Sequence, residues 1–484
     1  MEQDSLKRSA FSGFVWKFAE RIGAQLVSLL VSIVLARILL PEDYSVVGIV
    51  TIFFAFCNVF ITGGLNTALI QKKDADAEDY STIFWVNSII SAVLYVLMYV
   101  LAPFIANIYH NDLLIPIIRV MGIAFFINGM KAVLSAYISS TLQFKKSFLS
   151  TLVGTIFSAV IGIAMAVAGF GAWALVAQQM SSALIDTCIL FLTTKFRVQF
   201  VLSVKKLKEL LHFGSKMFVA SLISVLYDQI TPLIVGLKFT SNDLAFYTKG
   251  RSFPLLLNDT ITGSLSAVLF PVIAKKQDDK QSVLNMTRKY IGIASYVVFP
   301  IMLGFLAVAE NFVRVVLTDK WLFAVPYIQI FSFSYMFNII QTGNLEAIKA
   351  IGRSDIVLKL EIIKKSLYFT VILLFVLFTD SPEMLAFSSI VCTMIATIVN
   401  TVPNRSLIGY RYRDQMKDIL PNLLLAGSMG VVVLIMNRIP VAPVLMLVLQ
   451  LLAGAIIYVV LSVITKNEHF VYLLSILKQM VSKK

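Results

Sequence analysis

The sequence predicts an all-α polytopic membrane protein with about fourteen transmembrane helices. Its 484 residues are 58% hydrophobic and only 14% charged, and their mean hydropathy is +0.85. Soluble domains are nearer half apolar and a quarter charged. The apolar residues form many continuous runs of about 18 residues or more, which is the length that a helix needs to span a bilayer. Continuous runs favour helices over the alternating strands of a barrel.

A polar stripe begins just before the first predicted span, residues 22–40, and continues into it. Five polar residues, at successive spacings of four, four, three and four, share one helix face: Lys17, Arg21, Gln25, Ser28 and Ser32. Unpaired polar groups in hydrocarbon are costly, so this face is expected to line a water-filled cavity or to contact other helices. Alternatively, Lys17 and Arg21 anchor the helix at the inner membrane interface.

Thirteen further spans follow from the apolar runs. They are residues 45–70, 82–106, 114–137, 148–168, 172–192, 213–237, 253–274, 290–309, 324–347, 356–378, 384–402, 419–436 and 441–464. Proline and glycine inside several of these runs are compatible with this assignment, because membrane helices tolerate kinks.

The basic residues alternate with the predicted spans and indicate the orientation. Lysines and arginines gather in every second connection, for example at 72–73, 145–146 and 275–280. By the positive-inside rule these connections and both termini are cytoplasmic, and the net charge of +14 needs no nucleic-acid partner. The polar N-terminal segment lacks a small-residue cleavage site, so no cleaved signal peptide is expected.

The longest inner connection, residues 195–212, is basic and joins spans six and seven. Its second half, SVKKLKELLHF, sets lysines against leucines, which predicts an amphipathic helix on the inner membrane surface. The outer connections are short, such as 107–112 and 437–440. No predicted extramembrane segment is large enough for an active site of its own, so the chain is not expected to be an enzyme.

An internal repeat relates segments that lie 200 residues apart. Residues 58–69 and 258–269 are identical at six of twelve ungapped positions, among them Asn58/Asn258. The repeat aligns span two with span eight, so the two copies run in the same direction. It predicts two six-helix lobes related by an axis along the membrane normal, plus two C-terminal helices. The expected division is an N-lobe (1–194), the linker (195–212), a C-lobe (213–405), and spans thirteen and fourteen with a cytoplasmic tail (406–484).

Span seven carries a second polar stripe. Its members are Ser221, Ser224, Asp228 and Thr231. Asp228 lies deep in the span, where an acid is expensive, so a functional role is favoured. Asn58 and Asn258 are each followed by a threonine at i+4. For these asparagines, interhelical hydrogen bonding is the alternative to a binding role.

Several helix-end and loop motifs resemble those of one family. They are VLARILLPEDYSVVGIV (34–50), ALIQKKDADAEDYSTIFWVN (68–87), GFGAWALVAQQM (169–180), VLFPVIAKKQDD (268–279) and DKWLFAVPYIQIFS (319–332). The chain resembles Wzx-type polysaccharide flippases, in the polysaccharide-transporter branch of the MOP superfamily, and more narrowly the colanic-acid and lipopolysaccharide exporters. The resemblance covers nearly the whole chain and weakens after about residue 404.

This resemblance implies a multi-pass protein of the bacterial cytoplasmic (inner) membrane. It would move undecaprenyl-diphosphate-linked oligosaccharides to the periplasmic leaflet by alternating access, for surface polysaccharide biosynthesis. Lys17 and Arg21 suit the diphosphate. Gln25, Ser28, Asn58 and Asn258 suit the sugars, and Arg251 is a candidate release-side contact. No metal or cofactor is expected, polysaccharide-assembly proteins are possible partners, and the oligomeric state is open.

Energy coupling has no clear motif, because the chain lacks the glycine-rich loop that binds ATP. Glu20 and Asp228 are candidates for a proton- or ion-coupled cycle.

Two other functions stay open. A drug/cation antiporter of the same superfamily would centre on cavity acids, whereas span one carries two bases and one acid. A membrane polysaccharide polymerase or ligase would need a substantial outer loop.

Overall fold

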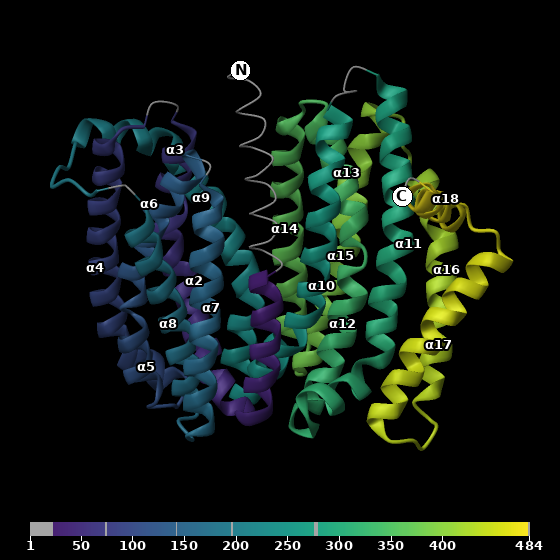
Figure 1. The fold of residues 1–484 in the computed structure, drawn as a ribbon, viewed down its shortest axis with the longest axis horizontal. Coiled ribbons are helices and arrows are strands. Elements are labelled where there is room, and N and C mark those ends of the chain that lie inside the picture. Colours follow the sequence, from purple (N-terminus) through teal and green to yellow (C-terminus); the bar gives the residue numbers. More distant parts are fainter. Residues whose placement is uncertain (1–22, 73–74, 142, 195–196, 275–278, 483–484) are drawn as a thin grey trace. The chain divides into compact units, whose positions relative to one another are not determined.

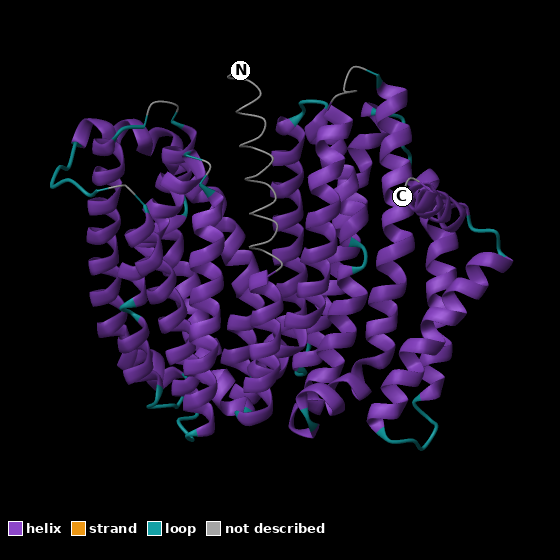
Figure 2. Ribbon diagram, in the orientation of Figure 1, coloured by secondary structure: helices purple, strands orange, loops and turns teal. Residues whose placement is uncertain are grey.

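A computed structural model describes residues 23–72, 75–141, 143–194, 197–274 and 279–482. All the regular elements in these ranges are helices (Figure 2). By length and composition, eleven of the described helical segments can cross a membrane. The predicted all-α class is therefore confirmed for the described part of the chain.

The described residues up to Ala245 form one compact unit, called here the first unit. It opens with a short apolar helix, Gly23–Ile38. Figure 1 shows the helices that follow, which are α2 (Pro41–Thr62), α3 (Leu65–Gln71), α4 (Ala77–Ile108), α5 (Leu114–Met121), α6 (Ala124–Ser140), α7 (Phe144–Val167), α8 (Ala172–Thr193) and α9 (Val204–Lys238).

Short-range caps explain where helices of this unit begin. The Asp43 carboxylate accepts a hydrogen bond from the Leu40 N–H at 2.9 Å, at the start of α2. The Asp243 carboxylate accepts one from the Thr240 N–H at 3.0 Å, at the start of α10 (Ser241–Ala274). Such caps satisfy N–H groups that have no partner within the helix. The two caps lie 200 residues apart, which is the offset of the predicted repeat.

The second predicted span, residues 45–70, is two helices rather than one. α2 ends at Thr62 and α3 begins at Leu65, with Gly63 and Gly64 between them. A Cβ atom on Gly64 would overlap the backbone carbonyl of Gly214 on α9. The break is therefore tied to the close approach of a helix that lies far away in the sequence.

The predicted surface helix in the linker is instead the start of a long helix. α9 runs unbroken from Val204 to Lys238 and contacts α2, α3 and α4. The segment before it is bound to α4, where Ser81 Oγ and Thr82 Oγ1 accept hydrogen bonds from the N–H groups of Gln199 (3.0 Å) and Ser203 (3.1 Å). The helix expected to open the C-lobe thus packs within the first unit.

The described residues from Phe246 onward form the second unit. After most of α10 it contains α11 (Lys280–Phe312), the π-helical turn Val313–Leu317, the 3-10 helix Asp319–Ala324, α12 (Val325–Tyr335), α13 (Asn338–Ala350), α14 (Ser354–Phe378), α15 (Pro382–Leu407), α16 (Tyr412–Met436), α17 (Pro443–Ile464) and α18 (Glu468–Ser482). α18 was not predicted from the sequence.

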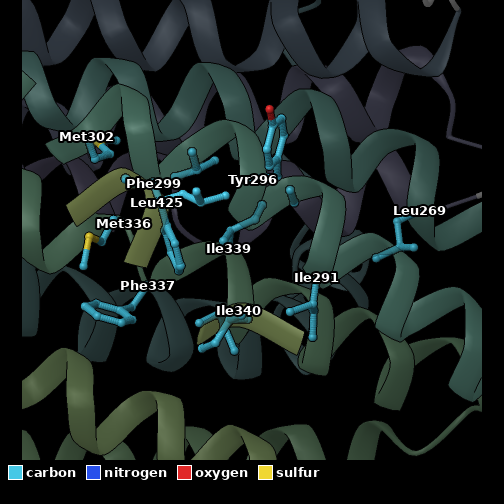
Figure 3. Close-up of a cluster of buried hydrophobic side chains, with 14 of the residues drawn as sticks. Leu269, Ile291, Tyr296, Phe299, Met302, Met336, Phe337, Ile339, Ile340 and Leu425 are labelled. Carbon is cyan, nitrogen blue, oxygen red and sulfur yellow. The ribbon is translucent and has the colours of Figure 1, made fainter. Parts of the chain in front are cut away.

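The core of the second unit lies between α11, α13 and α16. Phe299, Met302, Ile339 and Ile340 are fully buried there, and Figure 3 shows them packed with neighbouring apolar side chains. Close packing of this kind holds membrane helices together where both lipid and protein are apolar.

Most predicted spans coincide with apolar helices of spanning length. Three do not meet that criterion: the first described helix is shorter, and α10 and α14, at predicted spans 253–274 and 356–378, are not among the eleven candidates. The count of fourteen therefore stays a prediction. So do the repeat and the division into lobes 1–194 and 213–405.

Candidate functional site

The basic end of the first predicted stripe lies outside the described part of the chain. Lys17, Glu20 and Arg21 lie outside the described residues. Further along the same stripe, Gln25 is half-buried and Ser28 is exposed, on the helix Gly23–Ile38.

Asn58 connects two helices of the first unit. It lies near the end of α2, and its side-chain oxygen accepts a hydrogen bond from Asn128 Nδ2 on α6 at 3.0 Å. The hydroxyl of Thr62, one turn later, donates to the Asn58 backbone carbonyl at 2.8 Å. Asn58 is half-buried, so it takes part in interhelical hydrogen bonding and still has an accessible side.

An ion pair lies one helical turn beyond Asn128. Lys131 Nζ on α6 is 2.6 Å from Asp186 Oδ2 on α8. The Lys131 side chain is 38% exposed, whereas that of Asp186 is 4% exposed. Charged residues inside membrane spans are rare and usually functional. Sequence analysis missed both residues. The sequence feature that could have identified them is a single lysine and a single aspartate, each inside an apolar run.

The pair belongs to a partly exposed polar face. Beyond the first turn of α2, the exposed or half-buried polar residues are Thr51, Asn58 and Thr62, spaced by seven and four, which keeps them on one side of the helix. On α6 the half-buried polar residues include Asn128, Lys131, Ser135 and Ser139. α2 and α6 contact each other. Such a face is unsuited to lipid and suits water or a polar cargo.

Asp228 lies on α9 with an exposed side chain. Of its predicted stripe, Ser221 donates a hydrogen bond to the backbone carbonyl of Gly63 at 3.2 Å, at the break between α2 and α3. Ser221 therefore has a packing role, and Asp228, about two turns further along, does not share that contact.

In the second unit, Arg251 and Asn258 both lie on α10 and bond to neighbouring helices. Arg251 Nε donates to the Tyr335 hydroxyl at 2.9 Å. The side-chain oxygen of Asn258 accepts from Asn338 Nδ2 at 3.3 Å and from the Thr262 hydroxyl at 3.3 Å. Asn258 is buried, whereas its partner Asn338 is half-buried.

A buried amide network continues from that pair. Gln415 Nε2 on α16 donates to Asn344 Oδ1 at 3.0 Å, and Asn404 Nδ2 on α15 donates to the same oxygen at 2.7 Å. Asn344, Asn404 and Gln415 are at most 1% exposed. This network joins α13, α15 and α16 without any ionised group.

The described residues hold no group of three or more His, Cys, Asp or Glu side chains that is arranged for a metal ion. Ion pairs also occur on helices of the second unit, for example between Lys364 and Glu361 on α14 (2.6 Å) and between Arg288 on α11 and Asp418 on α16 (2.6 Å).

Comparisons of sequence identify relatives of this chain. A family model described as polysaccharide biosynthesis protein matches residues 34–326. Teichuronic acid biosynthesis protein TuaB of Bacillus subtilis (strain 168) is 27% identical over 311 residues, or 62% of this chain and 63% of TuaB. The match thus spans slightly under two thirds of TuaB. Lipopolysaccharide biosynthesis protein WzxC of Escherichia coli (strain K12) is 22% identical over 452 residues, or 88% of this chain and 89% of WzxC.

Solved structures show the same fold. Lipid II flippase MurJ, in an inward closed conformation, matches with a TM-score of 0.76 and 14% identity, over 94% of this chain and 99% of MurJ. An inward-facing multidrug resistance MATE transporter of the MOP superfamily matches with a TM-score of 0.63 and 16% identity, over 80% and 94% of the two chains. At such identities the likeness concerns the fold, and the predicted polytopic membrane fold is confirmed.

Proposed function

Because this chain belongs to the polysaccharide biosynthesis protein family, we propose that it is a flippase for lipid-linked oligosaccharides. It moves an undecaprenyl-diphosphate-linked repeat unit across the bacterial cytoplasmic membrane by alternating access, for surface polysaccharide biosynthesis. The observation that carries the proposal is the match over residues 34–326, joined with a fold shared with a lipid II flippase.

The polar face of the first unit suits such a cargo. A diphosphate is best held by charge-assisted hydrogen bonds, and sugar hydroxyls by amide and hydroxyl groups. Asn58 and Asn128 bring amides to this face beside the Lys131 ammonium. The proposed cargo contacts remain those of the sequence analysis: Lys17, Arg21, Gln25, Ser28, Asn58, Asp228, Arg251 and Asn258. Glu20 and Asp228 are the proposed coupling groups.

The proposed orientation follows the positive-inside rule. Both termini and the 195–212 connection are cytoplasmic, and cargo enters from that side. Lys206, in this connection, binds the acidic side chains of Asp76 and Glu78 at the start of α4. We infer that the protein transports its cargo without chemical change, and that partners are polysaccharide-assembly proteins.

The test is reconstitution of the full chain in proteoliposomes. Fluorescent lipid-diphosphate oligosaccharide is added, and the fraction reaching the inner leaflet is followed by a membrane-impermeant quencher. We expect flipping that depends on the protein, with the cargo mass unchanged. Uptake of cationic dyes without flipping would instead indicate the drug/cation antiporter, and a changed cargo mass would indicate an enzyme.

A further inference from the structure

The ion pair between Lys131 and Asp186 lies within two membrane-spanning helices. Lys131 is nine residues before the end of α6 at Ser140, about 14 Å along the helix. Asp186 is seven residues before the end of α8 at Thr193. Neither position is at a helix end, where a charge is readily hydrated.

The two partners differ in access. The Asp186 side chain is 4% exposed, and Gly154 of α7 lies directly behind it: a Cβ atom there would be 3.2 Å from the Asp186 Cβ. Lys131 is 38% exposed on the half-buried polar side of α6. The carboxylate thus forms the back of the site, and the ammonium forms its accessible front.

The hydrogen bonding of the pair is incomplete within the described chain. Asp186 Oδ2 contacts Lys131, whereas buried Asp186 Oδ1 has no hydrogen-bond partner among the described residues. An ammonium can donate three hydrogen bonds. A buried pair that served packing alone would be stabilised by satisfying both groups, because charges taken out of water are costly.

The corresponding place in the second unit has no charge. Asn128 and Asn338 each hydrogen-bond the repeat-related asparagines, and Lys131 and Gln341 each follow three residues later. Among the described residues, Gln341 bonds to neighbours in its own unit at 3.4 Å, including the Asn338 and Thr397 side chains. A neutral amide therefore suffices for helix packing at that place.

We propose that Lys131 binds an anionic oxygen group of the cargo, and that Asp186 positions the Lys131 ammonium. The group is a phosphate oxygen of the lipid diphosphate or the carboxylate of an acidic sugar. The inference rests on the proposed flippase function. Lys131 donates charge-assisted hydrogen bonds to the cargo while Asp186 holds the ammonium at the polar face.

The test compares four full-length variants in the flipping assay: Lys131→Met, Asp186→Leu, the double variant with both changes, and Lys131→Arg. Thermal unfolding in detergent is measured for each. Lys131→Met alone leaves Asp186 buried without its cation, so we expect a lower unfolding temperature. The double variant removes both charges, so we expect it to regain most of that stability.

The double variant separates binding from packing. We expect its flipping rate per folded protein to stay about tenfold or more below wild type, because a charge-assisted bond to cargo is lost. Flipping at the wild-type rate would overturn the inference and assign the pair to packing. Lys131→Arg keeps the charge and should flip better than Lys131→Met. Equal losses in these two would also overturn it.

Two cargoes identify the anionic group, one with a neutral oligosaccharide and one with a uronic acid sugar, both on lipid diphosphate. An equal loss of flipping for both cargoes assigns Lys131 to the diphosphate, and a loss for the acidic cargo alone assigns it to the sugar. If wild type flips neither cargo, the proposed function fails. If wild type flips both and the double variant matches it, only this inference fails.

Discussion

The two units contain similar asparagine pairs with different surroundings. Asn58–Asn128 and Asn258–Asn338 each join two helices. The first pair is half-buried beside an ion pair, whereas in the second pair Asn258 is buried, Asn338 is half-buried, and the neighbouring groups form an amide network. Amides satisfy packing without the cost of burying ions. Amides are enough to join the helices at this place in the second unit, so helix packing alone does not require the Lys131–Asp186 ion pair of the first unit. This difference favours the first unit as the place where cargo binds.

A second contrast concerns the helix that carries each asparagine. α2 ends at Thr62 and is followed by Gly63 and Gly64, whereas α10 continues through Gly263 and Ser264 to Ala274. The first unit brings α9 against its glycine pair. The same sequence pattern thus gives a broken helix where another backbone approaches closely and a continuous one elsewhere.

The amide network of the second unit should show the largest stability effect. Asn344→Leu removes the side-chain oxygen that accepts from both Gln415 and Asn404. The buried Gln415 amide then loses its acceptor, whereas Asn404 Nδ2 keeps its bond to the Asn344 backbone carbonyl at 3.1 Å. We expect a loss of about 3 kcal/mol, measured by unfolding in detergent. Gln341→Leu is the control, since its bonds are 3.4 Å long, and it should lose much less. Equal losses of unfolding free energy in Asn344→Leu and Gln341→Leu would show that the amide network is not cooperative.

The next largest loss of stability should come from the close contact between Gly64 and Gly214 in the first unit. Gly64→Ala places a methyl group against the Gly214 backbone, and we expect a loss of about 2 kcal/mol because helix backbones must separate. Gly427→Ala on α16 is the control, because a Cβ atom there has nothing within 4 Å, so this change should not destabilise the protein. Thermal unfolding measures both. A neutral Gly64→Ala would mean that α9 does not require the break.

The two asparagine pairs should then give similar, smaller effects. Asn58→Leu and Asn258→Leu each remove one interhelical hydrogen bond, so we expect about 1 kcal/mol in each case. Parallel unfolding measurements compare them. A large difference between the two would show that the pairs are not structurally equivalent, which would weaken the predicted repeat.

The smallest effect on stability should come from the contact between Lys206, in the 195–212 connection, and Asp76. The hydrogen bond from Lys206 is the main reason that the pKa of Asp76 is lowered to about 2. A lowered carboxyl pKa stabilises the folded state above pH ~4, and that stabilisation is lost as pH falls through about 2. Lys206→Ala removes it at neutral pH, so the amides of Gln199 and Ser203 should exchange hydrogen faster. Unchanged exchange would show that α4 holds the linker without Lys206.

Apolar runs and turn residues were sufficient to predict the helical class and most spans, because membrane helices need length and composition above all. The quoted motifs were sufficient to predict the family, which is confirmed. The break after Thr62 was missed because it depends on Gly214, about 150 residues later. The continuity of α9 was missed because the lysines at its start resemble those of a surface helix.

The candidate site was predictable only in part. Asn58 and Asn258 were selected for their polarity, but their partners Asn128 and Asn338 need the packing of other helices to be seen. Lys131 and Asp186 lie 55 positions apart in separate apolar runs, so neither forms a stripe or motif. An isolated charge inside a predicted span deserves a search for a partner in another span, and that search needs tertiary structure.

The most direct test is the flipping rate, per folded protein, of Lys131→Met/Asp186→Leu beside that of Gln341→Leu. We expect about a tenfold loss in the first-unit variant and a rate near wild type in the second-unit variant. That result would tie the charge of the first unit to cargo movement. Equal rates in the two variants would contradict the functional difference between the units.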